Sequence, residues 1–101
     1  MKRSLESIVY SQDTEVLAKF AKALGHPTRI AILKHLENQS CCFTGDLVEV
    51  FPLAQSTISQ HLKELKNAGL IQGELKPPKI KYCIHHDNWN KAKSLFQEFF
   101  E

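Results

Sequence analysis

The chain has 101 residues, enough for a single domain with a hydrophobic core of its own. Its 43% hydrophobic and 24% charged residues are ordinary for a globular protein, and a formal net charge of +2 does not by itself identify a nucleic-acid binder. No apolar run predicts a signal peptide or a membrane span, and three cysteines do not predict a disulfide framework, so we expect a reducing, cytoplasmic setting and no membrane partner.

The first predicted elements are amphipathic. Leu5, Ile8 and Val9 indicate an amphipathic turn or two at the start of the chain. Asp13 is the expected N-cap of a helix that ends at Gly25. The apolar stripe of this helix consists of Val16, Leu17, Phe20 and Leu24.

Two further helices are expected before the middle of the chain. Pro27 or Thr28 opens the first of them, and polar residues at 38–40 close it. Its expected core-facing residues are Ile30, Leu33 and Leu36. The second is short and extends from about Thr44 to Phe51.

The segment from Leu53 to Ile71 predicts a helix with two unlike faces. Ile58, Leu62 and Leu65 recur at the spacing of one core-facing stripe. The other side carries amides, hydroxyls and one cation, which can bond to base edges and phosphate oxygens in a DNA major groove. These polar residues are Gln55, Ser56, Ser59, Gln60 and Lys63. Gly69 suits the left-handed position that ends such a helix.

A change of period after this helix predicts a β-hairpin. Strand-like segments at 70–75 and 80–84 flank a tip at 76–79 that contains two prolines, which cannot donate ladder hydrogen bonds. The basic residues of the hairpin are Lys76, Lys79 and Lys81, opposed only by Glu74. Such a cluster is typical of a DNA-binding module, and equally of a solvated charged surface.

The last predicted helix carries more large apolar side chains than one core contact uses. Asp87 or Asn88 is its expected N-cap. Exposed aromatic residues favour aggregation, so we expect the first and last helices to pair with their copies in a twofold dimer. The predicted dimer-interface residues are Val16, Leu17, Phe20, Trp89, Leu95, Phe96 and Phe99. The alternative is that this stripe packs entirely inside one chain.

These elements predict a single winged helix-turn-helix domain over residues 1–101. The fold is mainly α with a β-hairpin wing (α+β), in the order α-α-α-α-β-β-α. Terminal helices at about 5–24 and 88–100 form the expected dimer interface.

Two motifs in the chain resemble the ArsR/SmtB family of small winged-helix transcriptional repressors. One is LGHPTR at 24–29, and the other combines STISQHL at 56–62 with AGL at 68–70. The resemblance covers about residues 15–85. It implies a homodimer that represses transcription on double-stranded operator DNA and is released by an inducer, whose identity it does not give.

The resemblance also implies a DNA-contacting set: Gln55, Ser56, Thr57, Ser59, Gln60, His61 and Lys63. Gln55 and Gln60 suit adenine, while Lys63 suits the phosphate backbone. His61 either donates to a phosphate or is a half-buried helix histidine. The lysines of the wing are expected to bind phosphate or the adjacent minor groove. Arg29 either joins this surface or is a structural partner inside the fold.

The cysteines are the candidate sensing residues. Some family members carry Cys-x-Cys before an Asp-Leu pair, but Phe43 and Gly45 occupy those two cysteine positions here. Other members bind zinc through paired ligands on the last helix, and residues 85–87 supply only the first half of such a pair. Three roles of the cysteines are compatible with the sequence. They can form a thiolate site for a thiophilic metal or As(III), an oxidant-sensitive Cys41–Cys42 pair, or buried thiols that only fill the core. The candidate thiolates are Cys41, Cys42 and Cys83. We expect a thiophilic ligand or an oxidant to lower operator affinity through Cys41 and Cys42.

Two other functions compete with an induced repressor. A constitutive winged-helix repressor would ignore small molecules, and a winged-helix protein-interaction module would need an apolar or acidic face. An enzyme is not expected, because the five histidines are scattered and no nucleophile–base pair or glycine-rich phosphate loop is present.

Overall fold

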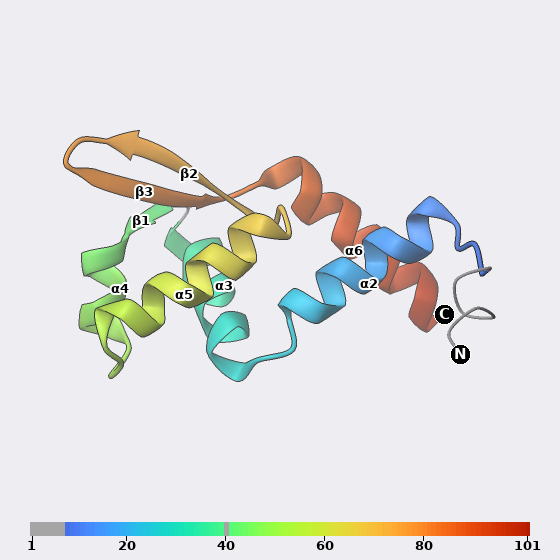
Figure 1. The fold of residues 1–101 in the computed structure, drawn as a ribbon, viewed down its shortest axis with the longest axis horizontal. Helices are drawn as coiled ribbons and strands as arrows, with labels where there is room; N and C mark the ends of the chain where they lie inside the picture. Colours follow the sequence, from blue (N-terminus) through green and yellow to red (C-terminus); the bar gives the residue numbers. More distant parts are fainter. Residues whose placement is uncertain (1–7, 40) are drawn as a thin grey trace.

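Five helices and three strands lie within residues 8–39 and 41–101, the part of the chain that the computed structural model describes (Figure 1). In chain order they are α2 (Gln12–Ala23), α3 (Pro27–Gln39), β1 (Cys41–Phe43), α4 (Thr44–Val50), α5 (Gln55–Asn67), β2 (Ile71–Lys76), β3 (Lys79–Ile84) and α6 (His86–Phe100). The predicted winged helix-turn-helix is confirmed, with the short strand β1 added between α3 and α4.

Local hydrogen bonds set the helix ends, and two predicted caps are wrong. Ser11, and not Asp13, caps α2, because its hydroxyl accepts from the Thr14 amide at 3.1 Å. Asp13 instead pairs with Lys91 on α6 at 3.3 Å. The cap of α6 is His85, whose Nδ1 accepts from an amide in the first turn at 3.2 Å.

The beginning of the described chain also differs from the prediction. Leu5 lies outside the described residues. Ile8 and Val9 are exposed and precede α2 without helical structure, so the expected early helical turn is wrong at these two positions.

The three strands form one antiparallel sheet in the order β1-β3-β2. The hairpin β2–β3 closes at Lys76 opposite Lys79, and β1 extends the sheet by pairing Cys41 with Cys83 and Phe43 with Lys81. Because β1 continues directly into α4, the sheet joins the wing to the helix-turn-helix formed by α4 and α5.

The core lies where α3, α5 and the base of the sheet meet. Its largest fully buried side chains include Leu36, Leu62 and Ile71, one from each of these elements. Ile30 is an error of the sequence-based prediction, because it lies exposed on α3 while Leu33 and Leu36 are buried.

Helices α2 and α6 lie side by side at one end of the molecule, away from the wing (Figure 1). The described chain is elongated, with extents of 47 × 31 × 24 Å. Phe20 of α2 and Leu95 of α6 belong to the buried core of one chain, so these two predicted interface residues are already covered. Among the described residues, no helix is both long enough and apolar enough to cross a membrane.

Candidate nucleic-acid interface

Helix α5 separates its apolar and polar side chains as the spacing predicts. Ile58, Leu62 and Leu65 are buried in the core. The side chains on the other face are exposed, namely Gln55, Ser56, Thr57, Ser59, Gln60 and Lys63. Gln60 donates from Nε2 to Glu64 at 3.1 Å, while the other exposed groups offer hydroxyls, an amide and an ammonium to solvent. Short polar side chains on a helix are the groups that read base edges in a major groove.

The two ends of α5 have different chemistry. Ala54 occupies the N-cap and supplies no side-chain hydrogen bond. Its carbonyl accepts from the Thr57 amide at 3.0 Å, which leaves the first-turn amides of Gln55 and Ser56 for solvent or an anion. Gly69 follows the helix with φ +87°, which confirms the predicted left-handed stop. Its carbonyl accepts from Asn88 Nδ2 at 2.9 Å, which ties the end of α5 to the start of α6.

A groove of about 410 Å³ lies between the beginning of α5 and the wing. Gln55 and Ser59 line it from α5, while Lys79 and Tyr82 line it from β3. Phe43 lines it from β1, and the Lys79 ammonium lies 5.4 Å from the centre of that ring. The groove therefore brings a helix face with hydrogen-bonding groups beside a cation of the wing.

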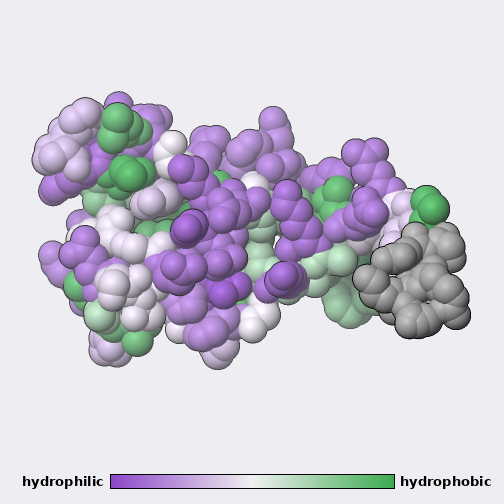
Figure 2. Space-filling view, viewed as in Figure 1, coloured by the Kyte–Doolittle hydropathy of each residue, from purple (hydrophilic) through white to green (hydrophobic). Residues whose placement is uncertain are grey.

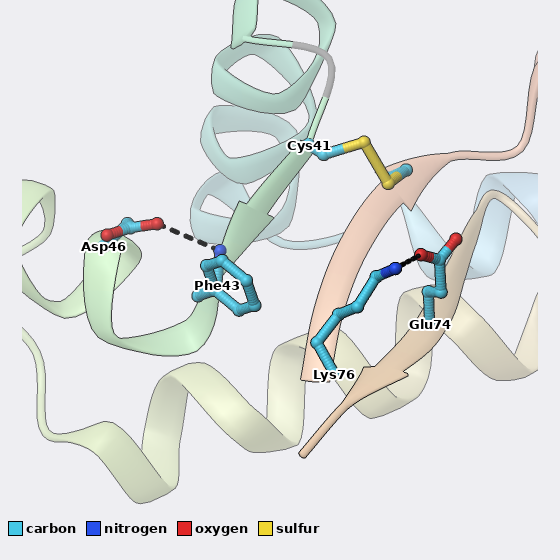
Figure 3. The surroundings of a disulfide bond; sticks show 6 residues. Cys41, Phe43, Asp46, Glu74 and Lys76 are labelled. Carbon is cyan, nitrogen blue, oxygen red and sulfur yellow. Dashed lines mark hydrogen bonds and ion pairs between the residues drawn. A yellow bond between two sulfur atoms is a disulfide. The ribbon is translucent and has the colours of Figure 1, made fainter. Parts of the chain in front are cut away.

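The lysines of the wing differ in their partners. Lys76 forms an ion pair with Glu74 at 2.9 Å, and the hydrogen bond from Lys76 is the main reason that the pKa of Glu74 is lowered (Figure 3). Lys81 lies opposite Glu74 in the strand register and is half-buried, whereas Lys79 is exposed at the groove. A phosphate approaching the wing would meet Lys79 without first displacing a carboxylate.

The structure contradicts the assignment of His61 to the DNA-facing set. Its side chain is only 9% exposed, and Arg29 Nε donates to its Nδ1 at 3.2 Å. The ring of His26 lies 4.4 Å away, centre to centre. Burial is the main cause that lowers the pKa of His61, and the charges of His26 and Arg29 lower it further. His61 is therefore a structural residue, and Arg29 is its partner inside the fold.

The cysteine count did not predict a disulfide framework, and the structure contains one disulfide that the sequence analysis did not predict. Cys41 and Cys83 are disulfide-bonded between β1 and β3 (Figure 3). Cys42 is a free thiol on the opposite side of β1, where it is buried. Within the described ranges, no three residues among His, Cys, Asp and Glu are grouped to hold a metal ion. The structure thus joins two of the three predicted thiolates, Cys41 and Cys83, and leaves Cys42 on the other side of the strand.

The predicted dimer residues are divided between the core and the surface of α2 and α6. Beside the buried Phe20 and Leu95, a second group packs against the core while keeping part of its surface exposed: Val16, Leu17, Trp89 and Phe96. Phe99 is 66% exposed near the end of α6. Figure 2 shows hydrophobic colours at this end and at the wing, with a mainly hydrophilic surface between them.

Sequence reasoning missed the residues that complete the groove and the partner of Cys41. Phe43 and Tyr82 reach the groove because β1 pairs with β3, and a three-residue strand gives no periodic signal. A signal for His61 was present, since it lies three residues after Ile58 and four before Leu65, which places it on the apolar stripe.

Comparison with known proteins agrees with this architecture. The model of the family described as "Bacterial regulatory protein, arsR family" matches residues 26–72, from the start of α3 into β2. The chain is 33% identical over 76 residues to the HTH-type transcriptional regulator YgaV of Escherichia coli, covering 75% of this chain and 77% of that protein. It is 44% identical over 85 residues to the uncharacterized HTH-type transcriptional regulator MJ1325 of Methanocaldococcus jannaschii, covering 83% and 94%. With the repressor SmtB of Mycobacterium tuberculosis it shares 37% identity over 74 residues, and it spans 54% of that relative's length.

Solved structures show the same fold. An ArsR-like transcriptional regulator from Rhodococcus superposes with a TM-score of 0.76 at 24% identity, over 88% of this chain and 83% of that chain. The transcriptional regulator HlyU of Vibrio vulnificus superposes with a TM-score of 0.65 at 27% identity, over 87% and 92%. These relatives are transcriptional regulators and not enzymes. The chain belongs to the arsR family of winged-helix transcriptional regulators.

Proposed function

We propose that this protein is a homodimeric, sequence-specific DNA-binding repressor that an inducer releases from its operator. The observation that carries the proposal is the exposed hydrogen-bonding face of α5 beside the basic wing, on two sides of one groove. A helix of this kind enters a major groove, while the wing binds the neighbouring phosphates. A twofold dimer would present two such faces to a pseudo-palindromic site. This function is exercised on chromosomal DNA, so a cytoplasmic setting is part of the proposal.

Three kinds of side chain contact different parts of the DNA in the proposed complex. Gln55 and Gln60 contact base edges, Gln60 after releasing Glu64. The hydroxyls of Ser56, Thr57 and Ser59 bind bases or phosphates, together with the uncapped amides of the first turn. The ammonium groups of Lys63, Lys76, Lys79 and Lys81 neutralise phosphates.

The test is binding to duplex fragments selected from the source genome, measured by fluorescence anisotropy at several salt concentrations. A dimer that contacts about 6–10 phosphates should lose roughly 10³–10⁵ in affinity between 50 and 200 mM salt. A protein that binds no genomic fragment at 50 mM salt would refute the proposal. Binding to an unrelated protein with little salt dependence would instead favour an interaction module.

Regulation by an inducer distinguishes the proposal from a constitutive repressor. The candidate sensing groups in the sequence are the cysteines. The described structure does not assemble them as a site for a thiophilic metal or As(III), because the sulfur atoms of Cys41 and Cys83 are bonded to each other and Cys42 lies on the other side of the strand. No step is therefore assigned to a bound metal. Operator binding that is unchanged by thiols, oxidants, As(III) and metals would favour the constitutive repressor.

A further inference from the structure

The disulfide lies at the junction between the wing and the helix-turn-helix. Cys83 belongs to β3 of the wing and pairs with Gln72 of β2 on one side and Cys41 of β1 on the other. Three residues after Cys41, β1 has ended and α4 has begun at Thr44. The sulfur–sulfur bond is thus a covalent connection between the strand that carries the wing cations and the segment that leads into α4 (Figure 3).

The other end of β1 belongs to the proposed DNA groove. Phe43 pairs with Lys81 in the strand register, and its ring lies under the Lys79 ammonium at 5.4 Å. The amide of Phe43 donates to Asp46 of α4 at 3.1 Å. A strand of three residues, with the disulfide at one end and the groove at the other, is therefore one of the connections that set the position of the wing, beside the contacts of β2 with α5 and of β3 with α3 and α4.

The three cysteines differ in accessibility. Cys41 and Cys83 are half-buried, whereas Cys42 is only 6% exposed. Burial, followed by the nearby Asp46 carboxylate, raises the pKa of the Cys42 thiol, which keeps it protonated and unreactive. A reagent in solution should therefore react with the Cys41–Cys83 pair and spare Cys42.

We propose that Cys41 and Cys83 form a reversible thiol–disulfide modification site that sets the DNA affinity of the protein, with the disulfide form binding more tightly. This inference rests on the proposed DNA-binding function. The reacting partners are a small-molecule thiol in one direction and a hydroperoxide in the other. The sign is opposite to the sequence-based expectation for an oxidant, because the partner of Cys41 is Cys83 and not Cys42.

The chemistry balances in both directions. A thiolate of the small molecule attacks one protein sulfur and displaces the other as a thiolate; a second small-molecule thiolate then resolves the mixed disulfide. The products are two cysteine thiols, once protons are taken up, and one small-molecule disulfide. In the reverse direction, a hydroperoxide converts one cysteine thiolate to a sulfenic acid with release of an alcohol or water. The second thiolate then forms the disulfide and releases water.

The effect on affinity follows from preorganisation. With the bond intact, Lys79 is held beside α5 before DNA arrives. After reduction, β3 keeps its backbone pairing with a three-residue strand and its contacts with α3 and α4 but loses the covalent bond, so the wing has more freedom and DNA binding has to order it. Ordering costs of this kind are on the order of a factor of ten in affinity. The salt dependence should also weaken, because fewer phosphates are neutralised.

The experiment compares full-length protein treated with hydrogen peroxide and with dithiothreitol, on the same selected DNA fragment at fixed salt. Alkylation followed by mass spectrometry should count one free thiol in the first sample and three in the second. Circular dichroism should show that both are folded. We expect the reduced form to bind about tenfold more weakly, and peroxide to restore binding.

Two variants make the result specific. Cys83→Ser should bind like reduced wild type under both treatments, while the matched Cys42→Ala should keep the full response. If Cys83→Ser does not fold, Cys41→Ser and the reduced wild type provide the same comparison. Equal affinities of the folded oxidised and reduced forms, or tighter binding after reduction, would overturn the inference. DNA binding absent from both forms would instead refute the proposed function.

Discussion

At the scale of single residues, Arg29 and His61 connect three helices. Arg29 belongs to α3, donates from Nε to His61 of α5 at 3.2 Å, and donates from its guanidinium to the Ala23 carbonyl at the end of α2 at 3.4 Å. The Nδ1 atom of His61 can accept this hydrogen bond only while it carries no proton. The geometry therefore requires a neutral imidazole beside a permanent cation.

Acidification should destabilise the protein through His61. The pKa of His61 is lowered on folding, so the unfolded chain binds the proton more readily than the folded chain. The stability that depends on a neutral His61 is therefore fully present above the ordinary histidine pKa of about 6.5. The free energy of unfolding should fall as the pH drops below that value, by at most about 1.4 kcal/mol per pH unit for one proton. Urea unfolding between pH 7.5 and 5.5 measures this slope.

Substitution identifies the residue responsible. His61→Gln keeps a hydrogen-bond acceptor for Arg29 but cannot titrate, so most of the slope should disappear. His86 is exposed at the start of α6, and His86→Gln is the matched control that should keep the slope. An unchanged slope in His61→Gln would show that other groups cause the pH dependence.

At the scale of elements, periodicity was sufficient for the helices and insufficient for the contacts between distant segments. The buried stripe of α5, the stop at Gly69 and the hairpin follow from spacing and from the special backbone of Gly and Pro. Strand β1 does not, because three residues show no period and its partner is 42 positions away at the disulfide. The α2 cap was mispredicted because Ser11 and Asp13 are both favourable N-cap residues; in the structure Ser11 accepts the first-turn hydrogen bond and Asp13 pairs with Lys91.

The wing and α5 should contribute differently to DNA binding. Lys79→Ala should weaken binding to all sequences to a similar extent and reduce the slope of log affinity against log salt by about 0.9 for each phosphate that is no longer neutralised. Gln55→Ala should instead reduce the preference for the selected site, by about 1–3 kcal/mol for each base that Gln55 reads. Both are measured by competition between the selected fragment and random duplex.

A control from outside the groove tests the role of net charge. Lys34 is exposed on α3, away from the groove lining and from helices α2 and α6, and Lys34→Ala has the same change of charge as Lys79→Ala. It should leave both affinity and salt slope near the wild-type values. If Lys34→Ala reproduced the effect of Lys79→Ala, net charge and not the wing would govern binding.

At the scale of the whole molecule, helices α2 and α6 leave apolar surface without a partner in the described part of the chain. Phe99 and Phe100 are 66% and 77% exposed at the end of α6. An apolar hollow of about 300 Å³ lies nearer the start of the same helix, lined by Leu24, Leu70, Trp89, Ala92, Lys93 and Phe96. Surface of this kind, on the two helices farthest from the wing, supports the proposed dimer.

Removing one aromatic residue should therefore separate the subunits. Burial of a large side chain contributes about 1.5–3 kcal/mol, and twofold symmetry doubles the effect, so Phe99→Asp should weaken the dimer by about 3–6 kcal/mol. Sedimentation equilibrium should show wild type at twice the chain mass and the variant near one. Leu75→Asp, at a wing residue that is 69% exposed, is the matched control and should stay dimeric. Because one chain reaches only one half-site, Phe99→Asp should also lose affinity for a two-half-site operator while keeping its fold. A wild-type protein that sediments as a monomer would contradict both the proposed dimer and the role of Phe99 in it.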